Sequence, residues 1–314
     1  MADAAAAAAA APEVYAAAEA EEKMPEIRLA LCKGRMKDGV FKLFADAGIK
    51  ITLGNERAYR PTVSWGNFDA KLLKPQNILG MLVQGSRDVG FGGHDWVLEL
   101  DLEGKVVEIM DTKMDPVRIV AAAPDPDVLK SGVGRGGRKL IIASEYSTIT
   151  QKWIKEKGLD ATFLRTWGAT ESLPPEDADI IVDNTATGST LKANGLHIVD
   201  TILTSSTRMF ASKAAMADEG KRAEIEKLVM LLESVKAARE RKMVTFNLLK
   251  GHDIDSVIEK LPCARMPTVS ELYHGGGYAV QVAVHSKLVP SLVPLIKSWG
   301  GTDVIVTAIS QLVS

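Results

Sequence analysis

Residues 178–191 read Ala178-Asp-Ile-Ile-Val-Asp-Asn-Thr-Ala-Thr-Gly-Ser-Thr-Leu191. A short apolar run ends at Asp183, small and hydroxylated residues follow up to Thr190, and a helix-forming segment then begins. A strand, an acid, a hydroxyl-rich loop and a helix start together suit a phosphate-binding loop, because backbone N–H groups and hydroxyls can all donate to the anion. The acid before the loop suits ribose hydroxyls or a metal ion, so a sugar phosphate is the expected ligand. The alternative is an ordinary turn capped by threonine and serine.

Strands and helices alternate on both sides of this segment. The pattern predicts strands at 26–31, 49–53, 117–123, 139–143, 161–165 and 197–212, and a strand running into a glycine-rich loop at 88–95. It predicts helices at 38–47, 77–83, 96–100 and 148–157. This alternation indicates an α/β fold with mostly parallel strands. Residues 117–196 form a second lobe, and 197–212 carry the chain back to the first, so a ligand is expected in the cleft between lobes.

The C-terminal third has a different order. A long amphipathic helix at 223–242 is followed by a strand, a helix, two strands, a helix and a last strand, ending near residue 309. This βαββαβ order is typical of a ferredoxin-like domain.

Composition limits the possible functions. The chain has 314 residues, 46% hydrophobic, and a formal net charge of −2. That balance disfavours a nucleic-acid partner, and no apolar window is long enough to cross a membrane. Cys32 and Cys263 form no metal-ligand pattern. Residues 1–24 are alanine-rich and match neither a secretory signal nor a transit peptide, which predicts a disordered extension and a cytoplasmic protein.

Four motifs in order resemble one family. They are Leu29-Ala-Leu-Cys-Lys-Gly-Arg-Met36, Asp88-Val-Gly-Phe-Gly-Gly-His-Asp95, the segment Asp179 to Leu196, and Arg265-Met-Pro-Thr-Val-Ser-Glu-Leu272. From about residue 27 to the C-terminus, the chain resembles ATP phosphoribosyltransferase, the first enzyme of histidine biosynthesis, in its long, self-regulated form.

The resemblance implies an architecture and a reaction. The architecture is a two-lobe, periplasmic-binding-protein-like catalytic part, with lobe I at 25–114 and 197–218, lobe II at 115–196, and a regulatory domain at 219–314. The reaction transfers the phosphoribosyl group of 5-phosphoribosyl 1-diphosphate to N1 of ATP, with Mg²⁺ on the diphosphate. The family also implies feedback inhibition by histidine and a homo-oligomer moving between dimer and hexamer.

The same resemblance implies site residues. The implied catalytic residues are Lys33, Arg35 and Asp183. The phosphoribosyl diphosphate would contact Glu171, Asp183, Thr185, Ala186, Thr187, Gly188, Ser189 and Thr190. ATP would contact Lys33, Gly34, Arg35, Gly90, Gly93 and Asp95, and histidine would contact Thr268, Ala283 and Val284. Without the resemblance, Lys33 and Arg35 could be solvated turn charges, Glu171 a helix cap, and Thr268 an ordinary strand residue.

A second interpretation places the protein in a different functional class, that of non-catalytic binding proteins. The two-lobe layout also suits a non-catalytic protein that binds or senses a small anion in its cleft. Such a protein has no need of an acid followed by four hydroxyl-bearing positions, so the loop at 185–190 favours the enzyme.

Overall fold

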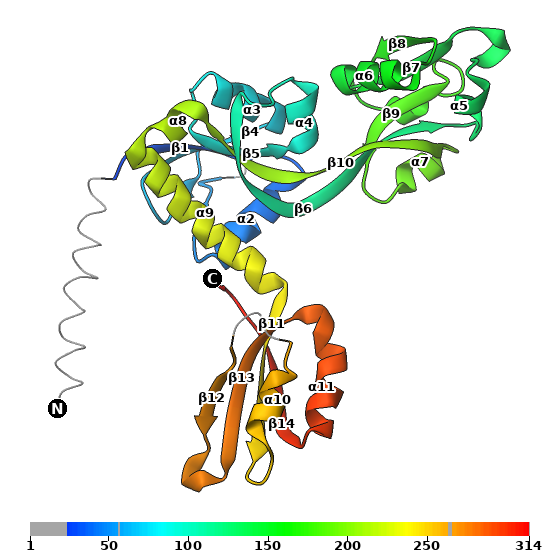
Figure 1. Ribbon diagram of the computed structural model, residues 1–314. Coiled ribbons are helices and arrows are strands. Elements are labelled where there is room, and N and C mark those ends of the chain that lie inside the picture. Colours follow the sequence, from blue (N-terminus) through cyan, green and yellow to red (C-terminus); the bar gives the residue numbers. More distant parts are fainter. Residues whose placement is uncertain (1–23, 56, 263–265, 314) are drawn as a thin grey trace. The chain divides into compact units, whose positions relative to one another are not determined.

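The structure is a computed structural model that describes residues 24–55, 57–262 and 266–313 (Figure 1). The extension expected at 1–24 therefore lies outside the described residues except for Met24, as does Cys263. Contacts divide the chain into two units: one reaches Lys42 and resumes over Lys50–Glu226, and the other comprises Leu43–Ile49 and the chain from Lys227 onward. Helix α9 (Glu219–Arg239) begins where the regulatory domain was expected to begin, but the division falls inside this helix. No loop marks the boundary, because one continuous helix carries the chain across it.

The first unit is built on an eight-stranded sheet with the order β4-β1-β5-β10-β6-β9-β7-β8. In that order the strands are β4 (Phe68–Leu73), β1 (Ile27–Cys32), β5 (Val89–Gly93), β10 (His197–Ser212), β6 (Val106–Ala123), β9 (Ile180–Thr185), β7 (Leu140–Ser144) and β8 (Ala161–Arg165). Strands β4, β1 and β5 are parallel and belong to one lobe, and β9, β7 and β8 are parallel and belong to the other. The long strands β6 and β10 pair antiparallel and run through both lobes (Figure 1). The expected two-lobe α/β architecture is confirmed.

Short helices cover this sheet. They are α2 (Met36–Asp46), α3 (Pro75–Val83), α4 (His94–Glu99), α5 (Val128–Ser131), α6 (Ser147–Lys157), α7 (Ser189–Ala193) and α8 (Lys213–Ala217). Smaller elements are the hairpin β2 (Ile51–Thr52) and β3 (Thr62–Val63), and the 3₁₀ turns η2 (Arg135–Gly137) and η3 (Thr170–Ser172). In the second lobe, apolar side chains of β7 and β9 pack with Trp153 of α6 in one buried cluster. Among the helices of the described residues, none is both long and apolar enough to cross a membrane.

Two local predictions were wrong. The strand expected at 117–123 begins at Val106, and its first half escaped notice because it is polar and its pairing with β10 shifts register repeatedly. The strand expected within 88–95 is β5, but it runs directly into helix α4 without the expected glycine-rich loop, and all five residues of β5 are buried. Its glycines are there because α3 packs closely on the strand: a Cβ on Gly90 would lie 2.6 Å from Cγ2 of Ile78.

The C-terminal unit has the order expected from the sequence. Its elements are β11 (Arg241–Leu249), α10 (Ile254–Glu259), β12 (Thr268–Glu271), η4 (Tyr273–Gly275), β13 (Gly277–His285), η5 (Ser286–Leu288), α11 (Val289–Ser298) and β14 (Gly301–Ala308). The sheet order is β12-β13-β11-β14, with every neighbouring pair antiparallel. Alternate residues of β11 and β13, such as Phe246 and Val282, are buried in one core with Ile296 of α11. The ferredoxin-like βαββαβ domain is confirmed.

Candidate active site

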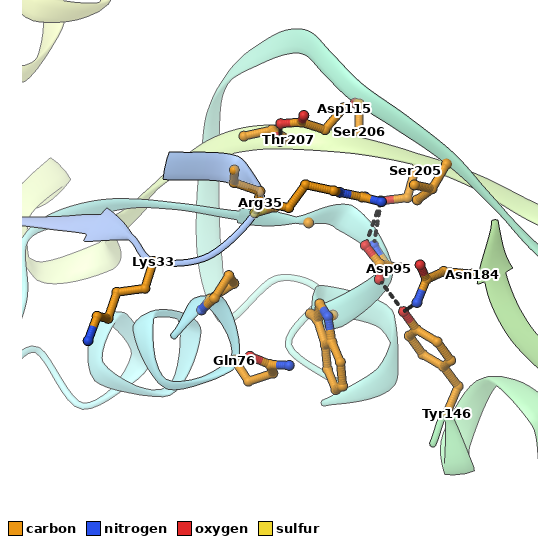
Figure 2. A pocket seen from close by; sticks show the side chains of 15 residues that line it. Lys33, Arg35, Gln76, Asp95, Asp115, Tyr146, Asn184, Ser205, Ser206 and Thr207 are labelled. Atoms are coloured by element: carbon orange, nitrogen blue, oxygen red, sulfur yellow. Dashed lines mark hydrogen bonds between the residues drawn. The ribbon is translucent and has the colours of Figure 1, made fainter. Parts of the chain in front are cut away.

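Two pockets adjoin in the first unit. The first, of about 240 Å³, is lined by Lys33, Arg35, Met36, Pro75, Gln76, Gly93, Asp95, Trp96, Asp115, Val117, Tyr146, Asn184, Ser205, Ser206 and Thr207 (Figure 2). The second, of about 350 Å³, is lined by Arg35, Glu171, Asp183, Asn184, Thr185, Ala186, Thr187, Ser189, Thr190 and Leu191. Arg35 and Asn184 line both pockets, so a ligand in one lies next to a ligand in the other.

The turn after β1 places the two expected cations differently. Gly34 has a φ of +75°, which is easily adopted only by glycine and turns the chain sharply between its neighbours. Both side chains line the first pocket, but Arg35 extends towards Asp95 and Ser205, whereas Lys33 extends in the opposite direction (Figure 2). The Lys33 ammonium lies 3.8 Å from the ring centroid of Tyr59, a cation–π contact at the pocket rim. Arg35 is therefore the cation already available to a ligand in either pocket.

Asp95, at the start of α4, is a buried carboxylate with a hydrogen-bond donor on each oxygen. Its Oδ1 accepts a hydrogen bond of 2.6 Å from Ser205 of β10, and its Oδ2 accepts one of 2.9 Å from the hydroxyl of Tyr146. Its backbone N–H donates to the Ser205 hydroxyl at 3.0 Å. Gly93 leaves room for this arrangement, because a Cβ there would collide with Oδ1 of Asp95. Asp95 is thus fixed by one residue from the second lobe and one from a crossing strand.

Tyr146 connects Asp95 to the second pocket. It lies two residues beyond the end of β7, its side chain is buried, and its ring packs on Trp96 at a centroid distance of 5.2 Å. Burial raises the pKa of Tyr146, and the charge of Asp95 acts in the same direction, so the hydroxyl stays protonated. That hydroxyl accepts a hydrogen bond of 3.2 Å from the side-chain amide of Asn184. Figure 2 shows Asp95, Tyr146 and Asn184 meeting at one side of the first pocket.

Asp183 lies in the second pocket, two residues before the end of β9. Burial, together with the negative charges of Glu171 and Glu145, raises its pKa from the ordinary 3.8 to about 6. A hydrogen bond from the backbone N–H of Asn184 acts in the opposite direction and only partly offsets this rise. Asp183 and Glu171 therefore lie close enough to sense each other's charge, as expected if both face one sugar. A ligand that brings hydroxyl donors or positive charge would stabilise the ionised form.

The loop after Asp183 is shaped by its own hydroxyls. The Thr185 hydroxyl accepts the backbone N–H of Gly188 at 2.9 Å, and Thr187 donates to the Ser189 hydroxyl at 3.0 Å. Gly188 has a φ of +82°, so a side chain there would be strained. Gly188 does not line the pocket, and its role is to let the loop turn. The remaining expected residues of the loop, 185–187 with 189 and 190, do line it.

Other expected residues lie farther from the pockets. Gly90 is a buried strand residue packed against α3 and lines neither pocket, and Gly34 acts through its backbone turn. In the C-terminal unit, Thr268 pairs with Gln281, so Thr268 and Ala283 lie on the same face of neighbouring strands. Val284 is 1% exposed and its side chain packs in the core, so only its backbone could meet a ligand on the face of Ala283.

The sequence interpretation missed Tyr146, Asn184 and Ser205. Tyr146 carried a positional signal, because it follows a parallel strand, at the edge of the sheet where α/β proteins bind ligands. Asn184 stood inside the quoted loop but was given no role. Ser205 carried no signal, since it is one polar residue in a long strand.

The architecture and the pockets together define a class. A two-lobe α/β protein with an arginine, four carboxylates and a hydroxyl-rich loop around adjoining pockets is suited to two phosphorylated small molecules, because such loops and arginine both donate hydrogen bonds to anions.

Comparison with known proteins identifies the family. A family model described as ATP phosphoribosyltransferase matches residues 74–234, and a model of its C-terminal domain matches residues 238–311. The ATP phosphoribosyltransferase of Chlorobaculum parvum is 36% identical over 91% of this chain and 97% of its own length. That of Pelotomaculum thermopropionicum is 34% identical over 92% and 99%. An ATP phosphoribosyl transferase (HisG:HisZ) complex from Thermotoga maritima includes a chain with a TM-score of 0.57 and 26% identity, covering 67% of this chain and 98% of its own.

The chain belongs to the ATP phosphoribosyltransferase family. It is an enzyme that transfers a pentosyl group, and its reaction is the ATP phosphoribosyltransferase step of histidine biosynthesis. The match to the C-terminal model also confirms the long form of the family.

Proposed function

We propose that the second pocket binds the phosphoribosyl group and that the first binds ATP. Asp183 and Glu171 would accept hydrogen bonds from the ribose hydroxyls, and the loop 185–190 would surround the 5-phosphate. The observation that carries this assignment is the pair of shared residues, Arg35 and Asn184, because they make the two pockets adjoin where the new bond must form.

The chemistry needs alignment more than acid–base catalysis. N1 of adenine already has a lone pair, and the ribose becomes positively charged as its bond to diphosphate breaks. The enzyme must therefore hold two polyanions side by side and stabilise the charge of the leaving diphosphate. Arg35, which reaches into the first pocket and borders the second, is suited to that leaving group. Lys33 would add a second cation once a ligand draws its ammonium from Tyr59.

Mg²⁺ is proposed to arrive with the substrate. Among the described residues, no group of three or more acidic, histidine or cysteine side chains is placed to hold a metal ion. Mg²⁺ commonly binds phosphate oxygens and keeps several waters, which suits a metal carried by the diphosphate. Bound there, it would neutralise part of the charge that develops on the leaving group.

Regulation is proposed to reside in the C-terminal unit. Histidine would bind on the open face of the sheet beside Thr268 and Ala283, with a backbone contact at Val284. It would inhibit by favouring a less active arrangement of the enzyme, which requires different affinities for two states. A homo-oligomer moving between dimer and hexamer, in the cytoplasm, completes the proposal.

The test is a spectroscopic assay. Near-ultraviolet absorbance, where N1-substituted adenine nucleotides absorb, is followed with ATP, 5-phosphoribosyl 1-diphosphate, Mg²⁺ and pyrophosphatase, with and without histidine. We expect a rise that needs both substrates and that histidine suppresses. A rise that histidine leaves unchanged would refute the regulatory assignment alone.

The matched variants are Asp183→Asn and Asp177→Asn. Asp177 is exposed and lines neither pocket, so its variant should keep full turnover. Asp183→Asn should lose most turnover, because an amide is a poorer acceptor for the ribose hydroxyls. Normal turnover in Asp183→Asn would exclude the proposed role of the second pocket.

A further inference from the structure

One chain of hydrogen bonds links the two pockets through a residue with no assigned role. The Tyr146 hydroxyl donates to Oδ2 of Asp95 at 2.9 Å and accepts from the Asn184 amide at 3.2 Å. The same Asn184 donates its backbone N–H to Oδ1 of Asp183 at 2.7 Å. Two residues of the second lobe, Tyr146 and Asn184, therefore connect a carboxylate of the first lobe with the carboxylate of the second pocket.

The centre of this chain is rigid. Tyr146 is 2% exposed, Asp95 is 5% exposed, and Ser205 holds the other oxygen of Asp95 from a crossing strand. The ring of Tyr146 packs on Trp96, which follows Asp95 in α4. Buried hydrogen bonds of this kind tolerate little displacement, because a broken bond leaves a buried polar group without a partner.

We propose that Tyr146 is a positioning residue that keeps the ATP-side carboxylate, Asp95, and the phosphoribosyl-side carboxylate, Asp183, at a fixed separation across the two lobes. The inference rests on the proposed assignment of the two pockets. Its hydroxyl is hydrogen-bonded to Asp95 and Asn184. It acts through Asp95 and Asn184, and so on the alignment of N1 of ATP with the anomeric carbon of the ribose.

Alignment affects turnover more than binding. Each substrate keeps its own contacts when Tyr146 loses its hydroxyl, so each is still bound, but their relative position becomes less well defined. A displacement of about 1 Å between reacting groups can cost about 100-fold in rate. The role therefore predicts a fall in kcat with little change in either KM.

The experiment compares Tyr146→Phe with Tyr273→Phe. The ring of Tyr146 remains to fill its buried site, whereas Tyr273 is 88% exposed in the C-terminal unit and serves as the control. Circular dichroism and thermal unfolding establish that each variant is folded at the assay temperature. We expect kcat of Tyr146→Phe to fall by about 10- to 100-fold, with both KM values within about twofold of wild type. Tyr273→Phe should match wild type.

A double variant separates alignment from a local packing defect. Ser205→Ala removes the other side-chain donor to Asp95, so the two substitutions should act on one constraint. The kcat loss of Tyr146→Phe with Ser205→Ala should then be smaller than the product of the two single losses. Multiplicative losses, an unchanged kcat in folded Tyr146→Phe, or a rise in KM alone would each overturn the inference. Full turnover in Asp183→Asn would instead contradict the proposed function, so the two failures are distinguishable.

Discussion

Replacing Asp183 with asparagine should make the protein more stable while making it inactive. Burial, with the charges of Glu171 and Glu145, raises the pKa of this carboxyl from 3.8 to about 6. The ionised form is therefore disfavoured in the folded protein relative to the unfolded chain. The asparagine side chain has the same shape, carries no charge, and its oxygen can still accept the backbone N–H of Asn184.

The sign and size of the stability change caused by Asp183→Asn follow from proton linkage. Between about pH 4 and pH 6 the folded state holds more protons at Asp183 than the unfolded state, so this group's contribution to stability falls as pH rises through that window. A difference of about two pH units corresponds to about 3 kcal/mol, and partial exposure reduces the expected effect to between about 1 and 3 kcal/mol. Asp183→Asn should recover that amount above about pH 7 and almost none near pH 4.

Urea unfolding followed by tryptophan fluorescence measures this difference at several pH values. Trp65, Trp96, Trp153 and Trp167 lie in the first unit with Asp183, so the signal reports mainly on that unit. Asp177→Asn, at an exposed position, should change stability by less than about 0.5 kcal/mol at every pH. The reasoning is refuted by an Asp183→Asn variant that is no more stable than wild type at about pH 7.5, or by a gain independent of pH.

Two further substitutions test the first lobe. Burial opposes ionisation of Asp88, but hydrogen bonds from Arg28 and Lys221 outweigh it and hold the pKa at about 2. The ionised Asp88 should stabilise the fold above about pH 4, and this stabilisation should be lost as pH falls through about 2. Asp88→Asn should lower the free energy of unfolding, measured in urea at neutral pH, by about 3–5 kcal/mol. Gly90→Ala should cost about 1–3 kcal/mol in the same assay, since its Cβ would lie 2.6 Å from Cγ2 of Ile78, and an unchanged stability would show that α3 moves freely on β5.

The parts of the fold that could be predicted are those with a local pattern. Strand β9, the acid near its end and the loop after it lie within one short segment, which a short apolar run followed by turn residues makes recognisable. The C-terminal unit was predictable for the same reason, because each strand and helix of its βαββαβ order has a hydrophobic pattern of its own and is bounded by turn residues.

The failures occur where tertiary contacts override local preference. The first half of β6 contains Lys113 and Asp115 at φ values of +58° and +47°, and its pairing is held by contacts such as the Thr207 hydroxyl to Asp115 at 2.8 Å. A polar segment with such bends lacks the alternation of apolar and polar residues by which a strand is recognised in a sequence. Glycines in β5 indicate a loop in the sequence, but in the fold they are the only residues small enough for the close approach of α3 and of Asp95.

The same distinction divides the candidate site. The proposed phosphoribosyl side is one loop whose residues are neighbours in sequence, so the sequence alone could suggest its chemistry. The proposed ATP side joins Asp95 to Tyr146, 51 residues away, and to Ser205, 110 residues away, and no local pattern connects them. A substitution in the loop should thus impair the contacts of one substrate. A substitution in the buried series of hydrogen bonds through Tyr146 should instead impair the alignment of the two substrates. Because alignment is what this reaction chiefly requires, residues that the sequence leaves unmarked can matter to turnover as much as those in the motif.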